Sequence, residues 1–182
     1  MNYTIPTNVH LEMQRAAFVL GVDMELVGGA LRDAVLGGEV KDYDLVFVGD
    51  REQMYQYMYK LGELGFEPCH HSEYASDEPY VFDMRKGAIN IIMYDESVVA
   101  DIEVLISKYD MNINQYRLVD GQLVNNYFDG STVKINPYRD ALGHTTRLSA
   151  RVERFKEKYP NLDWSVVDGM KRDSVYGCYV DE

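Results

Sequence analysis

One segment constrains the fold more than any other part of the chain: residues 26–48, with the sequence LVGGALRDAVLGGEVKDYDLVFV. It predicts a short strand over residues 24–27 that breaks at Gly28-Gly29, a helix over residues 30–36, and an apolar strand over residues 43–48. A glycine pair between a strand and a helix leaves backbone N–H groups available at the start of the helix, where they attract an anion. The segment therefore predicts a strand–helix–strand unit with an anion site at its first turn.

Two aspartates, Asp42 and Asp44, stand where the second of these strands begins. Residues two apart on a strand point to the same face, so their carboxylates converge. Such oxygen ligands suit Mg²⁺ or Mn²⁺, and a pair of these ions can activate an attacking hydroxyl and stabilise a leaving phosphate. Two plainer interpretations stay open. The aspartates can be solvated acids at a strand end, and the glycines can serve only a tight turn in which Arg32 pairs with Asp33.

The rest of the chain predicts a mixed α+β domain with a helical tail. Thr7 is expected to cap a helix that ends at Gly21, and Lys86-Gly87 and Asp120-Gly121 are expected to turn two hairpins. The expected helices are residues 7–20, 51–64, 98–107 and 148–159, with another after residue 161, and the expected strands are residues 80–84, 88–94, 111–118 and 122–128. This order favours a mixed sheet flanked by helices.

The segment 26–48 resembles the head-domain motif of polymerase-beta-type nucleotidyltransferases, in the group that contains bacterial poly(A) polymerases and CCA-adding tRNA nucleotidyltransferases. That motif reads GGxxRDxxLGxxxxDxD, and every specified position matches this sequence. The resemblance implies a nucleotidyltransferase-type head over residues 1–131 and a helical neck or tail extension over residues 132–182. It also implies that Asp42 and Asp44 are catalytic and hold Mg²⁺ or Mn²⁺.

A second stretch, residues 108–114, resembles the family motif Arg-Arg-Asp-Phe-Thr-Ile-Asn more weakly. Asp110 and Asn114 agree with it, Lys108 keeps one positive charge, and Tyr109 replaces an arginine. In the family, the aspartate of this motif helps to bind the ribose of the incoming nucleotide. The resemblance therefore extends the expected nucleotide site to this stretch.

Beyond the head, the run from His144 to Arg147, followed by Arg151 and Arg154, resembles the helix that selects the base in CCA-adding relatives. His144 takes the place of an acid there, so base selection by the family's mode is not implied. The residues that the resemblance places at the nucleotide are Gly28, Gly29, Arg32, Asp33, Lys108, Asp110, Asn114, Arg147 and Arg151, and those that it places at RNA are Arg154 and Lys158.

The superfamily usually has a third carboxylate on a neighbouring strand, and here the matching position is Asn90. An amide can coordinate a metal through its oxygen but brings no charge. Asp83 and Asp95 are the two candidates to compensate. The alternative is a protein that binds nucleotides without turnover.

The net charge of −12 and the pI near 4.7 argue against strong autonomous binding of nucleic acid. Residues 1–131 carry a net charge of −13, whereas residues 132–158 carry seven Lys and Arg against three acids. The only basic stretch thus coincides with the expected neck helix. We expect an NTP substrate and an RNA 3′ end as acceptor, with tRNA as the first candidate. A protein side chain or a cationic small molecule such as an aminoglycoside is the alternative.

Cysteine content and hydropathy predict the compartment. Cys69 and Cys178 are the only cysteines, which rules out a disulfide framework, and Cys69-His70-His71 is interpreted as an ordinary loop or strand end rather than a metal site. No window approaches the ~20 apolar residues of a membrane span, and the start MNYTIPTNVH lacks the features of a signal peptide. We expect a cytoplasmic protein with no membrane partner. A partner protein is a candidate to supply the body and tail domains of full-length relatives, which we expect this chain to lack.

Overall fold

The structure, a computed structural model, describes residues 3–69, 80–136, 145–172 and 179–180. Its centre is a seven-stranded sheet with the order β3-β4-β5-β2-β1-β6-β7. The strands are β1 (Glu25–Val27), β2 (Tyr43–Gly49), β3 (Glu67–Pro68), β4 (Tyr80–Lys86), β5 (Ile89–Asp95), β6 (Arg117–Val119) and β7 (Gln122–Val124). β2 and β5 run parallel while the other pairings of the described strands are antiparallel, so the sheet is mixed.

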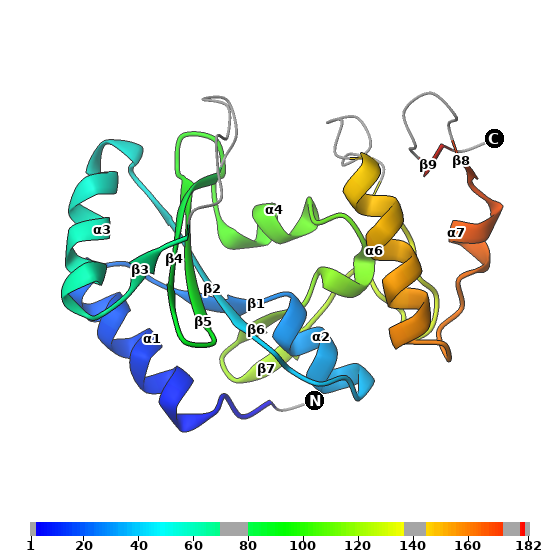
Figure 1. The fold of residues 1–182 in the computed structure, drawn as a ribbon, viewed down its shortest axis with the longest axis horizontal. Coiled ribbons are helices and arrows are strands. Elements are labelled where there is room, and N and C mark those ends of the chain that lie inside the picture. Colours follow the sequence, from blue (N-terminus) through cyan, green and yellow to red (C-terminus); the bar gives the residue numbers. More distant parts are fainter. Residues whose placement is uncertain (1–2, 70–79, 137–144, 173–178, 181–182) are drawn as a thin grey trace.

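Helices lie on both faces of this sheet and at one end of it (Figure 1). They are α1 (Thr7–Leu20), α2 (Gly29–Leu36), α3 (Met54–Glu63), α4 (Ile102–Ser107), α6 (Thr145–Lys158) and α7 (Ser165–Gly169), with 3₁₀ turns η1 (Arg51–Gln53) and η2 (Asn112–Asn114). Two short strands, β8 (Lys171–Arg172) and β9 (Tyr179–Val180), pair with each other. In the described part of the chain, each helix is too short or too polar to cross a membrane.

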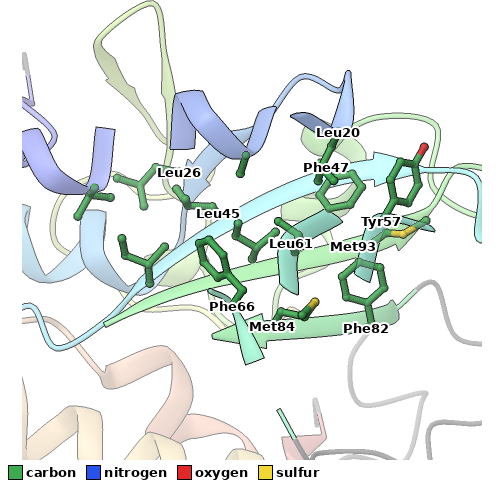
Figure 2. Packing of buried hydrophobic residues seen from close by; sticks show 14 of the residues in the cluster. Leu20, Leu26, Leu45, Phe47, Tyr57, Leu61, Phe66, Phe82, Met84 and Met93 are labelled. Atoms are coloured by element: carbon green, nitrogen blue, oxygen red, sulfur yellow. The ribbon is translucent and has the colours of Figure 1, made fainter. Parts of the chain in front are cut away.

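Alternation along the strands sends apolar side chains to both faces of the sheet. On one face, Leu45 and Phe47 of β2 pack against Leu20 of α1 and against Tyr57 and Leu61 of α3 (Figure 2). α2 contributes to the same cluster. On the other face, α4 covers the centre of the sheet through a smaller cluster, which contains Val27, Val46, Val99, Leu105 and Ile106. The central strands are therefore buried on both faces, and this packing fixes the positions of the ends of β2 and β5.

A second core joins α6 to the sheet domain. Leu148, Val152 and Phe155 of α6 pack against Met111 and Ile113, which flank and form η2. Figure 1 shows α6 and α7 at the end of the molecule opposite α1 and α3. α6 also lies near α2, so α6 faces the turn that contains Gly28 and Gly29.

The predicted fold class is confirmed: an α+β structure with a mixed sheet flanked by helices. The turn at Asp120-Gly121 is also confirmed, because both residues have a positive φ, 50° and 75°, as a tight hairpin requires. The predicted caps were less accurate. Pro6, not Thr7, precedes the first helix, and α4 begins only at Ile102 because the Asp101 carboxylate accepts a hydrogen bond from the Val104 N–H at 2.8 Å.

The predicted strand over residues 111–118 is wrong for most of its length, because only residues 117 and 118 belong to a strand, β6. Asn112 is buried, its side-chain oxygen accepts from the Lys134 N–H and its side-chain nitrogen donates to the Thr132 carbonyl, both at 2.9 Å. These bonds tie the chain to the segment that follows β7 and replace the ladder of a strand with the turn η2. The strand predicted over 122–128 ends at Val124 for a similar reason, since the Asn125 side chain accepts from two backbone N–H groups beyond it.

Candidate active site

Asp42 and Asp44 lie at the start of β2, in the middle of the sheet. Asp44 stands opposite Val27 of β1 on one side and opposite Asn90 of β5 on the other. The Asn90 side-chain nitrogen donates a hydrogen bond to Asp44 Oδ1 at 2.9 Å. Asp42 is exposed and Asp44 is half-buried. The predicted position of Asn90, beside the aspartates on a neighbouring strand, is therefore what the structure shows.

Burial and neighbouring acids dominate the electrostatics of Asp44. Burial raises the pKa of Asp44, and the charges of Asp42 and Asp83 raise it further. The hydrogen bond from Asn90 and the charge of Arg151 act in the opposite direction without cancelling the shift. A divalent cation bound here would stabilise both carboxylates in their charged form.

The donor set fits such a cation only in combination with a ligand. Among the described residues, no three His, Cys, Asp or Glu side chains are grouped to hold a metal ion. Mg²⁺ is commonly bound by one or two carboxylates while substrate phosphates and water complete its shell. Asp42 and Asp44 match that arrangement, with oxygen ligands and room on the exposed side of Asp42.

The glycine turn lies beside the aspartates, because Gly28 follows Val27, the residue opposite Asp44. Gly28 has φ 70° and ψ −123°, a conformation that is open almost only to glycine. Its N–H donates to the Tyr116 carbonyl at 2.8 Å, and a Cβ at this position would lie 3.6 Å from the Tyr109 ring. Gly29 begins α2, so the first N–H groups of that helix start next to Asp44.

Arg32 and Asp33 are buried in a polar network rather than displayed on the surface. Arg32 is 8% exposed, and its side chain donates from Nε to Asp33 Oδ1 at 2.7 Å and to the Tyr159 hydroxyl at 3.0 Å. Its Nη1 donates to Asn114 Oδ1 at 2.5 Å, and its guanidinium lies 4.3 Å from the centre of the Phe155 ring. The pairing with Asp33 is thus present, and contact of Arg32 with phosphate stays a prediction.

The same network continues on both sides of Arg32. Asn114 donates to Asp110 Oδ1 at 2.7 Å, and Asp110 Oδ2 accepts from Arg151 of α6 at 2.5 Å. On the other side, Asp33 accepts from Lys158 at 2.7 Å and from the Tyr159 hydroxyl. We call the set that joins α2, η2 and α6 the neck network; its members are Arg32, Asp33, Asp110, Asn114, Arg151, Lys158 and Tyr159.

The neck network keeps Asp33 ionised. Burial alone would raise the pKa of Asp33, but hydrogen bonds from Lys158 and Tyr159 and the charge of Arg32 outweigh it, so the pKa is lowered. The structure therefore brings together most of the residues expected at the nucleotide, and it does so mainly by pairing them with one another.

The other expected residues are more scattered. Lys108 follows α4 as its C-cap and is exposed, Arg154 is exposed on α6, and only the backbone of Arg147 belongs to the described part. His144, His70, His71 and Cys178 lie outside the described residues. Of the three tyrosines on α3, Tyr57 is buried in the core, while Tyr55 and Tyr59 are 78% and 70% exposed.

Asp83 and Asp95, the two candidates to compensate for the missing carboxylate at Asn90, lie at different distances from Asp44. Asp95 ends β5, at the opposite end from Asn90, where it accepts from Arg51 at 2.6 Å and from the Ser97 N–H at 2.9 Å. Asp83 lies on β4 and stands opposite Ile92, two residues along β5 from Asn90. Asp83 thus shares the face of Asp44, and Asp95 is too far along the strand to take part.

Sequence reasoning did not identify Tyr159 as a member of the site. The available signal was its position four residues after Phe155 on an amphipathic helix, which puts both rings on the buried side. A buried tyrosine needs a partner for its hydroxyl, and here the partners are Asp33 and Arg32.

No protein family model matches the sequence. Among solved structures, the chain is similar to a tRNA-processing enzyme at 19% identity and a TM-score of 0.62, over 92% of this chain and 47% of that one. It is also similar to the CCA-adding enzyme of Thermotoga maritima, solved with a tRNA, at 18% identity and a TM-score of 0.60, over 91% of this chain and 41% of that one. The CCA-adding enzyme of Bacillus stearothermophilus, solved with CTP, matches at 18% identity and a TM-score of 0.55, over 85% and 40%.

These comparisons confirm the predicted resemblance at the level of the fold. The chain shares the fold of part of these CCA-adding enzymes, and it spans less than half the length of these solved structures. At such identities the likeness establishes the architecture alone, and the chemistry depends on the individual residues of this chain.

Proposed function

We propose that the protein is a metal-dependent nucleotidyltransferase, which moves a nucleoside monophosphate from an NTP to an acceptor hydroxyl and releases pyrophosphate. The observation that supports this most is the register between β1 and β2, in which Val27, just before the glycine turn, faces Asp44. An anion-binding turn and a pair of metal-type carboxylates are neighbours, as transfer from a triphosphate requires.

The residues of this chain would bind and orient the triphosphate. Its oxygens would accept hydrogen bonds from the N–H groups at the start of α2, where the absence of a side chain at Gly28 and Gly29 allows close approach. Asp42 and Asp44 would hold Mg²⁺ or Mn²⁺ together with phosphate oxygens. The bound metal supplies charge neutralisation at the phosphates and lowers the pKa of the attacking hydroxyl.

We propose an RNA 3′ end, with tRNA as the first candidate, as the acceptor. The support is the basic helix α6, whose Arg154 is exposed and which the neck network fixes beside the glycine turn. If α6 binds RNA phosphates, Arg154→Ala should weaken RNA binding and reduce its salt dependence by about one counterion. Lys156→Ala is the matched control, because Lys156 already pairs with Asp168.

The test incubates the protein with Mg²⁺, each labelled NTP, and RNA, protein and small-molecule acceptors, and follows pyrophosphate and label. Transfer to RNA that falls by at least about 100-fold in Asp42→Asn, but not in the surface control Asp120→Asn, supports the proposal. Label on a protein or an aminoglycoside keeps the chemistry and replaces the acceptor. NTP binding without pyrophosphate release from any mixture would overturn the proposal in favour of a nucleotide-binding module.

A further inference from the structure

The position of the acceptor follows from the order of the strands, once the triphosphate is placed as proposed above. The glycine turn and α2 lie on the β1 side of Asp44. In phosphoryl transfer the attacking and leaving oxygens are roughly in line. If pyrophosphate leaves toward β1 and α2, the acceptor hydroxyl must approach from the other side of Asp44, over β5 and then β4.

Few groups on that side can accept a proton. Asn90 of β5 is an amide whose side-chain nitrogen is already directed at Asp44. On β4, Arg85 stands directly opposite Asn90, and Asp83 stands opposite Ile92, one diagonal step from Asn90. Diagonal neighbours on one face lie about 7–8 Å apart. Asp83 is therefore the carboxylate that β4 presents on the face of Asp44, while Glu67 of β3, opposite Arg85, lies one strand further from Asp44.

Asp83 already makes the contact that a general base makes with an acceptor. The Tyr80 hydroxyl donates a hydrogen bond to Asp83 Oδ1. Asp83 is half-buried, and its charge is close enough to Asp44 to influence that carboxylate. A hydroxyl of a substrate that replaced the Tyr80 hydroxyl would donate its proton to Asp83 in the same way.

We propose that Asp83 is the general base of the transfer and that the acceptor hydroxyl binds where the Tyr80 hydroxyl now lies, over β4 and β5. The acceptor oxygen forms a bond to the α-phosphorus of the NTP, and the bond from that phosphorus to the bridging oxygen of pyrophosphate breaks. The hydroxyl proton moves to the Asp83 carboxylate, and pyrophosphate leaves with the electron pair. Asp83 thus supplies, from β4, the negative charge that Asn90 does not supply from β5.

The inference rests on the proposed function, and its test separates the two. Pyrophosphate release from ATP and Mg²⁺ is measured against pH, with a mixed RNA pool as acceptor and with water alone. Asp83→Asn should lower the rate by about 100-fold or more, which is the usual contribution of a general base, while ATP affinity in the presence of Mg²⁺ stays at the wild-type value. The residual rate should rise with pH, because hydroxide then replaces the missing base. Tyr80→Phe should keep or increase the rate, since it removes the hydroxyl that competes with the acceptor for Asp83 and leaves the Cys69 thiol as its side-chain partner.

The controls make the outcome decisive. Asp120→Asn carries the same chemical change on an exposed turn and should leave the rate unchanged, and Asp83→Glu should recover part of it. A wild-type rate in Asp83→Asn, with the rate abolished in Asp42→Asn, would overturn the role of Asp83 and leave the proposed function standing. An absence of pyrophosphate release from the wild type under all conditions would remove the proposed function and this inference together.

Discussion

Removal of one oxygen atom from the neck network provides a sharp test of how α6 is held. In Tyr159→Phe the ring stays, so its packing against Phe155 and its contact with the Arg32 guanidinium are retained. What is lost is a hydroxyl that accepts from Arg32 Nε at 3.0 Å and donates to Asp33 Oδ1. All three side chains are at least nine-tenths buried, so water cannot easily replace the missing partner.

The expected cost follows from the charges involved. A hydrogen bond to a charged group contributes about 1.5–3 kcal/mol to the free energy of unfolding. A buried polar group that loses its partner also destabilises the folded state, because its desolvation is no longer compensated. Asp33 keeps Lys158 and Arg32 as partners, so we expect the lower half of that range, about 1.5–2 kcal/mol. This corresponds to a fall in Tm of roughly 3–8 °C for a domain of this size.

The measurement is the free energy of unfolding from urea titration, with m compared between variants to check that the unfolding transition is unchanged. Tyr55→Phe is the matched control, because Tyr55 is 78% exposed on α3 and its change should stay within about 0.5 kcal/mol. If Tyr159→Phe were no less stable than Tyr55→Phe, the buried hydroxyl would contribute nothing and the neck network would not be what fixes α6.

Three further predictions concern the turn, the aspartates and pH. Gly28→Ala should destabilise the protein by about 1–3 kcal/mol and weaken ATP binding, because φ is 70° there, whereas Gly62→Ala, in open space on α3, should stabilise it by about 0.5–1 kcal/mol in the same urea titration. Asn90→Asp should lower Tm without metal, since it places a second carboxylate against Asp44, and should enlarge the rise in Tm that Mg²⁺ produces. Because the pKa of Asp33 is lowered in the folded state, its stabilisation is present above the unfolded pKa of about 4 and is lost as the pH falls through the folded pKa; acid unfolding of Asp33→Asn should be less steep than that of the wild type.

The sequence could predict the strand–helix–strand unit because its determinants are local. Alternation places Asp42 and Asp44, glycine allows the backbone angles of the turn, and the apolar run of β2 is short and uninterrupted. The same local signals account for the hairpin at Asp120-Gly121. Where a buried asparagine replaces the ladder, as at Asn112, the local pattern still reads as a strand and the prediction fails, since the partners lie 20 and 22 residues further along the chain.

The role of Arg32 was harder to predict, because its partners come from distant parts of the chain. It contacts Asn114, 82 residues on, and Tyr159, 127 residues on. The motif placed Arg32 on the first turn of α2 correctly, but nothing local shows that α6 folds back over that turn. A single sequence gives the chemistry of each residue, while its partner depends on the tertiary packing of a second core.

Pairing within the neck network also changes what the charge distribution means for the acceptor. The basic stretch of α6 directs Arg151 to Asp110, Lys158 to Asp33 and Lys156 to Asp168. Cations already paired with carboxylates of the chain release fewer counterions and attract RNA phosphate less strongly.

The side of the sheet from which the acceptor would approach carries Asp42 and Asp83. An RNA acceptor must therefore approach an acidic surface and should need bound Mg²⁺ and nucleotide to dock, whereas a cationic acceptor should bind this surface without either, more weakly as salt is added. The dependence of acceptor binding on Mg²⁺ thus distinguishes the two classes before any turnover is measured.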